Sequence, residues 1–197
     1  FRTLLPETDE WQLNASYSRN LSERVELSLN ASYELSDSFS LNGLPSVDFV
    51  VPGTSPFSQS GTDSTVQRFY LTPQPLARNS TSETRSASAG LSGDSAGWRW
   101  SLNGNYSEIE NRTLTDRTLD ADALQAMVAA GMADPFAAST GQGLAFDQRD
   151  FSYGLNTTAD VTAQGSKGIF DLPAGEVQLS LNGGYNRQDI SSYATRS

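Results

Sequence analysis

The nine residues VELSLNASY at 25–33 decide the fold class, and two close variants occur later, WRWSLNGNY at 98–106 and VQLSLNGGY at 177–185. Each stretch begins with an apolar residue, ends on tyrosine eight residues later, and has a Leu-Asn step near its centre. Apolar and polar residues alternate along each stretch, which is the period of a β-strand with one apolar face. The spacing of the copies is too irregular for a solenoid repeat. The pattern predicts strands built to one common specification.

The same alternation occurs elsewhere in the chain, so about six long strands are expected. Their centres are predicted at 11–17, 25–35, 86–91, 98–106, 151–161 and 177–186, of which 86–91 is the weakest. The connections alternate in length, with short turns predicted at 18–24, 92–97 and 163–175 and long loops at 36–80 and 110–147. Short periplasmic turns and long extracellular loops are typical of antiparallel outer-membrane barrels.

The two long loops differ in character. The first holds five of the eight prolines, so it is expected to be mostly irregular, with 66–71 as a possible short strand. The second contains LDADALQAMVAAG at 119–131, which has helical character. Asp120 is a candidate N-cap and Gly131 a candidate stop. The residues expected to share one face of this helix are Leu124, Met127 and Val128.

A barrel strand shows lipid only at every second residue, and the alternation divides the strand residues into two predicted sets. The residues predicted to face lipid are Trp11, Leu13, Val25, Leu27, Leu29, Tyr33, Trp98, Trp100, Leu102, Tyr106, Tyr153, Leu155, Val177, Leu179, Leu181 and Tyr185. Those predicted to face the lumen are Asn14, Glu26, Asn30, Glu34, Arg99, Asn103, Asn156 and Asn182. Eight residues of strand tilted by about 45° rise roughly 19 Å, which places the closing tyrosines near the boundary of a membrane's apolar band.

Composition excludes several kinds of function. The chain has 13 basic and 23 acidic residues and a net charge of −10, so no basic stripe exists to bind nucleic acid. It has neither cysteine nor histidine, and no catalytic site, metal site or cofactor is predicted. Glu26, Glu34 and Arg99 face the same side. They are interpreted either as an interior ion-pair network or as a polar lining that contacts a permeating solute.

Alternation alone also fits a soluble β-sandwich binding module, whose apolar face would be its core, or a β-solenoid adhesin. Two features favour the barrel instead. The predicted strands are longer than the usual length of about 5–6 residues, and tryptophan and tyrosine stand at strand ends. No run approaches the roughly 18 apolar residues of a membrane-spanning helix.

Several phrases resemble the barrel of TonB-dependent outer-membrane receptors, most closely the large proteobacterial kind common in sphingomonad-type bacteria. They are TLLPETDEWQLNASYSRNLSERVELSLNASYEL, PFSQSGTDSTVQRFYL, GWRWSLNGNYSEIENRTLTDRTLDADALQAMVAAG and IFDLPAGEVQLSLNGGY. The resemblance covers nearly the whole chain. It implies a 22-stranded barrel, a plug domain, and a TonB box coupled to the inner-membrane energy source. It also implies uptake of scarce solutes such as ferric siderophores, cobalamin, haem or carbohydrates.

The sequence shows no plug, TonB box or signal peptide, since FRTLLPETDE has neither a basic n-region nor an apolar h-region. Residues 1–197 are therefore interpreted as one partial, antiparallel all-β barrel domain in the bacterial outer membrane. Its expected partners are membrane lipid, the remaining barrel with its plug, the TonB system through those parts, and a small solute. The alternative is a small structural or adhesive outer-membrane protein.

Overall fold

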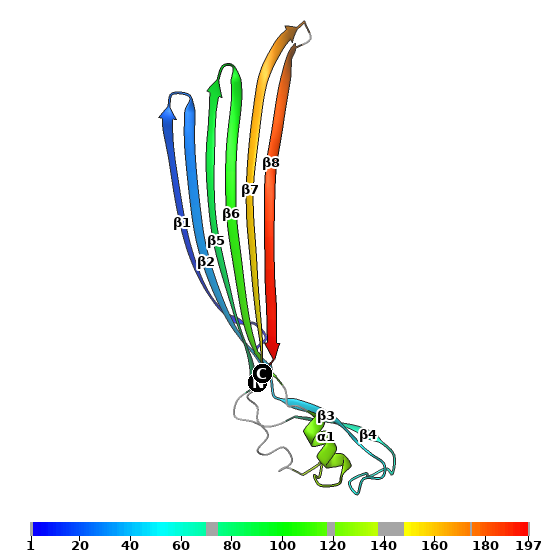
Figure 1. Ribbon diagram of the computed structural model, residues 1–197. Coiled ribbons are helices and arrows are strands. Elements are labelled where there is room, and N and C mark those ends of the chain that lie inside the picture. Colours follow the sequence, from blue (N-terminus) through cyan, green and yellow to red (C-terminus); the bar gives the residue numbers. More distant parts are fainter. Residues whose placement is uncertain (1, 70–74, 118–120, 138–147, 174, 197) are drawn as a thin grey trace.

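The computed structural model describes residues 2–69, 75–117, 121–137, 148–173 and 175–196. The fold is all-β apart from a short helix, with six long strands in one antiparallel sheet and two short strands in a second (Figure 1). The elements are β1 Glu7–Ser22, β2 Val25–Gly43, β3 Ser46–Val51, β4 Ser64–Phe69, β5 Leu76–Ser95, β6 Trp98–Asp116, α1 Ala121–Ala129, β7 Arg149–Leu172 and β8 Gly175–Arg196.

The large sheet follows the chain, because each long strand pairs with the next long strand in the order β1-β2-β5-β6-β7-β8. The strand pairs β1–β2, β5–β6 and β7–β8 are each connected at the same end of the sheet, which we call the turn end (Figure 1). Tight turns make the first two of these connections. Ala96 and Gly97, between β5 and β6, have φ angles of 52° and 80°. Positive φ at both residues suits the two-residue turns that follow the right-handed twist of a hairpin. In the described part of the chain β1 and β8 do not pair, so the sheet is open.

The strands are longer than the alternation predicts, and the predicted turns 18–24, 92–97 and 163–175 are too long. The predicted loops 36–80 and 110–147 are likewise too long, since β2 continues to Gly43 and β5 begins at Leu76. The extension of β5, ARNSTSETRS, is polar on both faces, and that of β2, SDSFSLNG, has Phe39 and Leu41 as its apolar side chains. A backbone ladder needs no apolar face, so pairing continues where the hydrophobic period has ended.

The first long loop is not mostly irregular, because it contains the hairpin of β3 and β4. Pro45 and Pro52 flank β3 directly, and each stands just outside the hydrogen-bonded ladder. Prolines therefore delimit this strand instead of excluding it. The predicted short strand at 66–71 is present as β4, although residues 70 and 71 lie outside the described part.

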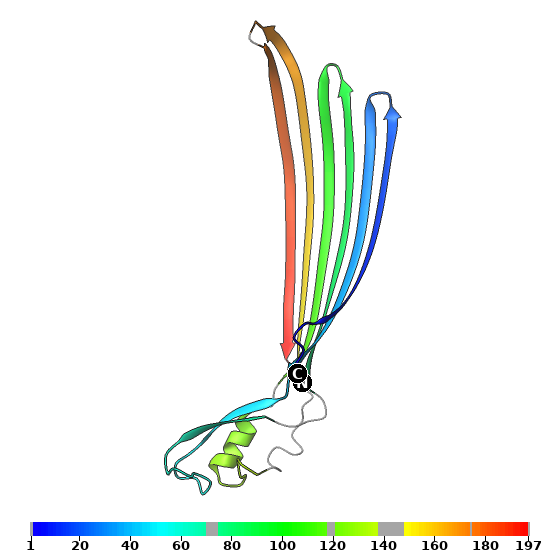
Figure 2. The ribbon, with the colours of Figure 1, turned by 180° about the vertical axis from the view of Figure 1, so that it is seen from behind.

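The two long loops fold together into one small unit, formed by β3, β4 and α1, which we call the loop unit (Figures 1 and 2). Its core of buried side chains joins β3 to the helix and consists of Val47, Phe49, Val51, Leu124 and Val128. The Gln125 side chain accepts a hydrogen bond from the Val50 amide at 2.7 Å and donates one to the Val50 carbonyl at 2.8 Å. Arg68 of β4 donates to the Pro135 carbonyl at 2.8 Å.

The helix ends where the sequence predicts it. Gly131 has φ of 70°, its amide donates to the Val128 carbonyl, and the Met132 amide donates to the Met127 carbonyl. This pair of bonds is the Schellman arrangement, which favours glycine at that position. The predicted shared face of the helix is confirmed, since Leu124 and Val128 are buried and Met127 packs against them. The candidate N-cap Asp120 lies outside the described residues.

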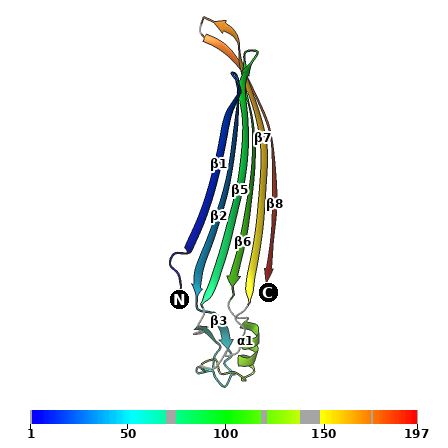
Figure 3. The ribbon, with the colours of Figure 1, turned by 90° about the vertical axis from the view of Figure 1, so that its left-hand side faces the viewer.

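The large sheet is a single curved layer, as the view from its side shows (Figure 3). Among the described elements α1 contacts β3, and no helix or strand packs on either face of the six-stranded sheet. The loop unit lies beyond the end opposite the turns, where β1 begins and β8 ends (Figures 1 and 3). In the parts of the chain that the structure describes, no helix has the length and hydropathy needed to cross a membrane.

The shared core makes a first prediction. Leu124→Ala removes a fully buried side chain, and such changes destabilise by about 2–5 kcal/mol. Because the same core holds both loops, limited proteolysis of the full chain should then cut β3–β4 as well as the helix region. Met132→Ala is the matched control, since Met132 is 76% exposed. Cleavage of the helix region alone would mean that the two loops fold independently.

Candidate functional site: the two faces of the sheet

The register of the sheet sorts the strand side chains into two faces, because directly paired residues in an antiparallel sheet point the same way. All sixteen residues predicted to face lipid share one face, which we call the apolar face. All eight residues predicted to face the lumen share the other, the polar face. Paired positions illustrate the separation: Leu27 stands opposite Leu91 and Leu91 opposite Leu102, whereas Asn30 stands opposite Ser88.

The apolar face is uncovered. On the edge strand β1, Trp11 is 73% exposed, and on β8 Tyr185 is 69% exposed. Central strands show the same property, with Leu102 of β6 45% exposed. Large apolar patches on a monomer mark contact with a partner or a membrane, because exposing them to water is unfavourable.

The apolar residues form a band that crosses the sheet obliquely. The central leucines of the three repeated phrases show this, since they lie on β2, β6 and β8. Leu29 pairs with Ala89 of β5, and Ala89 pairs with Gly104 of β6, so Leu29 and Gly104 lie in one row across the sheet. Gly104 is two residues beyond Leu102. In the same way Leu102 lies in one row with Ala163 of β7 and Gly183 of β8. Gly183 is two residues beyond Leu181. Each copy is therefore set two residues nearer to the turn end than the copy two strands before it.

This step corresponds to a definite angle. Two residues of strand rise about 6.6 Å and two strand spacings span about 9.6 Å, so the band departs by about 35° from the perpendicular to the strands. Barrel strands tilt by about 35–45° from the barrel axis. If the strands are tilted by this angle from the barrel axis, the oblique band lies perpendicular to that axis. The repeated phrases have the stagger that a tilted barrel requires.

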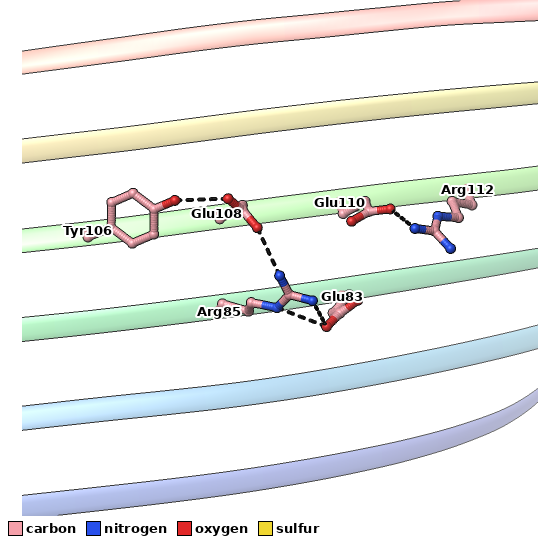
Figure 4. Close-up of polar contacts among 6 residues, drawn as sticks. All are labelled: Glu83, Arg85, Tyr106, Glu108, Glu110 and Arg112. Atoms are coloured by element: carbon pink, nitrogen blue, oxygen red, sulfur yellow. Dashed lines mark hydrogen bonds and ion pairs between the residues drawn. The ribbon is translucent and has the colours of Figure 1, made fainter.

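Charged residues follow Tyr106 on the apolar face, on the side away from the turns. Figure 4 shows these side chains. Leu155 and Tyr153, which were predicted to face lipid, lie in the same rows as Glu110 and Arg112 and so outside the band. The Tyr106 hydroxyl donates to Glu108 at 2.8 Å, and Glu108 pairs with Arg85 of β5 at 3.2 Å. The Arg85 guanidinium also donates twice to Glu83, at 2.5 Å and 2.9 Å. Farther along β6, Arg112 pairs with Glu110. A ring followed at once by ion pairs is the sequence of groups found at a membrane–water boundary.

This charged cluster was not predicted from the sequence. Its signal is visible in YSEIENR at 106–112, where the apolar-face positions change from tyrosine to charged residues while the alternation continues. Glu83 lies beyond the apolar band, and its hydrogen bonds from Arg85 lower the pKa of the Glu83 carboxyl below its ordinary value. These exposed pairs contribute little to stability, so their position is more informative than their strength.

Polar side chains on the other face pair with one another across the strands. The Ser32 and Ser86 hydroxyls lie 2.6 Å apart, and the Asn105 amide donates to Asp160 at 2.9 Å. Such pairs satisfy amides and hydroxyls within the sheet.

The sequence left two interpretations for Glu26, Glu34 and Arg99, and the structure places all three on the polar face. Within the described ranges no ion pair joins the three side chains, and both interpretations stay predictions. The described residues also contain no group of three or more acidic side chains that could hold a metal ion.

No protein-family model matches the chain, and no curated protein matches it. The resemblance to TonB-dependent receptors therefore stays a prediction. The structure itself supplies the open antiparallel sheet and its two unlike faces.

Close packing at the turn end of the apolar face gives a second prediction. A Cβ at Gly93 would lie 2.6 Å from the Arg24 carbonyl oxygen and 2.9 Å from the Trp100 ring. Gly93→Ala should therefore lower the free energy of unfolding by about 1–3 kcal/mol, because a backbone atom and a large ring must shift. Gly183 lies on the same face with nothing within 4 Å of its Cβ position, so Gly183→Ala is the control. Equal effects of the two changes in denaturant unfolding would contradict this packing.

Proposed function

We propose that this chain supplies consecutive strands of an outer-membrane β-barrel. The apolar face contacts lipid, and the polar face lines a water-filled interior. The tight turns lie on the periplasmic side, and the loop unit lies outside the cell. The chain acts as part of a transport scaffold and catalyses no reaction.

The oblique apolar band carries this proposal. A soluble sandwich would bury the apolar face under a second sheet, yet the second sheet in the described residues lies beyond the strand ends. The band is offset by the same two residues between β2 and β6 as between β6 and β8. A flat apolar medium met by tilted strands selects such a regular offset.

The ends of the band support the same proposal. The row that contains Tyr33 meets Glu108 on β6, and the row that contains Tyr106 meets Arg187 on β8. The tyrosines therefore follow the same oblique line as the leucines. Glu108 and Arg187 lie directly past Tyr106 and Tyr185 on the apolar face, whereas Leu35 and then Asp37 follow Tyr33. Tyrosine favours this level because its ring rests among hydrocarbon while its hydroxyl reaches polar groups.

The narrower proposal is that the whole barrel is a TonB-dependent receptor for a scarce solute such as a ferric siderophore. It is supported by the resemblance of the phrases around the three strand repeats and of the segment that follows β6. On this proposal the plug domain and the coupling to the TonB system belong to other parts of the receptor. The loop unit would contribute to solute recognition, since binding residues often lie on loops held by a rigid scaffold.

A small structural or adhesive outer-membrane barrel is the second candidate. The compact core of the loop unit favours it, because a folded unit at the loop end offers a stable surface to another cell or molecule. Energised uptake by the complete barrel would support the receptor. Attachment without uptake would support the adhesive protein.

The lipid contact is tested by site-directed labelling of the complete barrel in lipid vesicles. Cysteines at Leu29, Leu102 and Leu181 should give labels in a hydrocarbon environment, because these positions lie in the apolar band. Cysteines at the adjacent asparagines should give labels in water, and these matched positions are Asn30, Asn103 and Asn182. Equal accessibility of the two sets would exclude the barrel.

The open edges make a further prediction. In hydrocarbon each unpaired backbone group on β1 and β8 costs several kcal/mol, so these strands must pair with further strands or with another copy. The isolated chain should therefore oligomerise or aggregate in detergent and show no energised uptake. Light scattering and single-channel conductance measure the outcome. A monodisperse monomer with a closed pore would show instead that the chain completes a small barrel by itself.

A further inference from the structure

The polar face carries an open hollow of about 470 Å³ at the turn end of β6, β7 and β8. Its volume lies within the range of roughly 300–1,000 Å³ that is usual for small-molecule sites. The side chains that line it come from all three strands and include Arg99, Ser101, Gln164, Ser166, Gln178 and Asn182. Each of these residues points to the polar face in the register of the sheet.

These side chains have no partners, whereas several other polar groups on the face pair across the strands. Asn30 pairs in this way with Ser88, and Gln188 pairs with Asn156. In the hollow no side-chain hydrogen bond joins any of the six lining residues named above to another described residue. Unpaired amides, hydroxyls and a guanidinium gathered in one place are free to bind a solute.

Arg99 gives the hollow its charge. It is the charged residue of the lining, in a chain whose net charge is −10, and it forms no ion pair with any described residue. A guanidinium binds carboxylate or phosphate through two parallel hydrogen bonds. The surrounding serines, glutamines and asparagine both donate and accept, which matches the hydroxyls of a polyol.

We propose that this hollow binds small, hydroxyl-rich anions, with the carboxylate or phosphate on Arg99 and the hydroxyls on the amides and serines around it. The site extends the proposed function and rests on it for its role, since the polar face must line the lumen for a passing solute to reach it. The binding itself depends only on the sheet.

One neighbouring group competes with the ligand. Asp94 of β5 stands directly opposite Arg99 in the register, and Glu26 lines an adjoining hollow together with both residues. A rotation of the Arg99 side chain toward Asp94 would draw it away from the anion. Removing the charge of Arg99 should therefore weaken binding of the anion. Removing the charge of Asp94 should strengthen it.

The experiment titrates the complete barrel that contains this chain, purified in detergent micelles, with gluconate, using calorimetry. Arg99→Gln should weaken binding by about tenfold or more, the usual effect of losing a charge-assisted hydrogen bond. Asp94→Asn should strengthen it by about threefold, as expected for removing an exposed competing charge. Arg187→Gln is the control, because Arg187 lies on the apolar face, pairs with Asp189 at 2.8 Å, and should have no effect.

Sorbitol, which has the hydroxyls without the charge, should bind at least about tenfold more weakly than gluconate. Glycerol 2-phosphate distinguishes phosphate from carboxylate as the preferred anion. If Arg99→Gln loses the β-sheet signal in circular dichroism, Gln178→Ala on the edge strand replaces it and should also weaken binding.

Absence of binding by gluconate and glycerol phosphate would overturn the inference, as would equal losses in the Arg99 and Arg187 variants. Failure of the proposed function is separately recognisable. If gluconate binds but labels at Leu102 and Asn103 are equally accessible in lipid, the binding site is supported and the barrel is contradicted. If the labels differ as expected but gluconate does not bind, the barrel is supported and the binding site is contradicted.

Discussion

A single-layer sheet that is apolar on one side needs apolar surroundings on that side, and this need governs the arrangement of the molecule. Burying apolar surface is worth roughly 25 cal/mol per Å², so an uncovered face of this kind is unfavourable in water. Nothing among the described elements covers it, and leucines in the middle of the sheet remain exposed. The backbone ladder fixes the strands to one another. It leaves the apolar face to be satisfied from outside.

The close-packed interior of the described chain therefore lies away from the sheet. The fully buried side chains Val51, Leu124 and Val128 belong to the loop unit, where a hairpin from one loop meets a helix from the other. Gln125 adds two hydrogen bonds to the outer edge of β3 and so satisfies backbone groups that a two-stranded ribbon leaves open. The unit is stabilised as a soluble protein is, while the sheet is not.

This division explains what the sequence could predict. The strand centres and their faces were predictable because alternation in stretches such as 25–35 and 98–106 reports a boundary between apolar and polar surroundings. The strand ends were not, because polar residues such as those at 78–86 pair through the backbone and leave no periodic signal. Strand β3, the partner of the predicted short strand at 66–71, was missed because prolines at its margins are also typical of an irregular loop. The packing of α1 on β3 joins residues about 75 positions apart, and no local pattern specifies such contacts.

The polar face could be predicted as a face but not as a site. Alternation places Arg99 and Asn182 on the same side, yet only the register shows that they meet in one hollow. The register also supports the proposal of a membrane over that of a soluble core. A second sheet packed at a fixed angle would need a compact patch, whereas the band here moves by the same two residues at each pair of strands. The charged groups Glu108 and Arg187, directly past Tyr106 and Tyr185, move with it. A flat boundary met by strands tilted about 35° accounts for the leucines, the tyrosines and the charges by one angle.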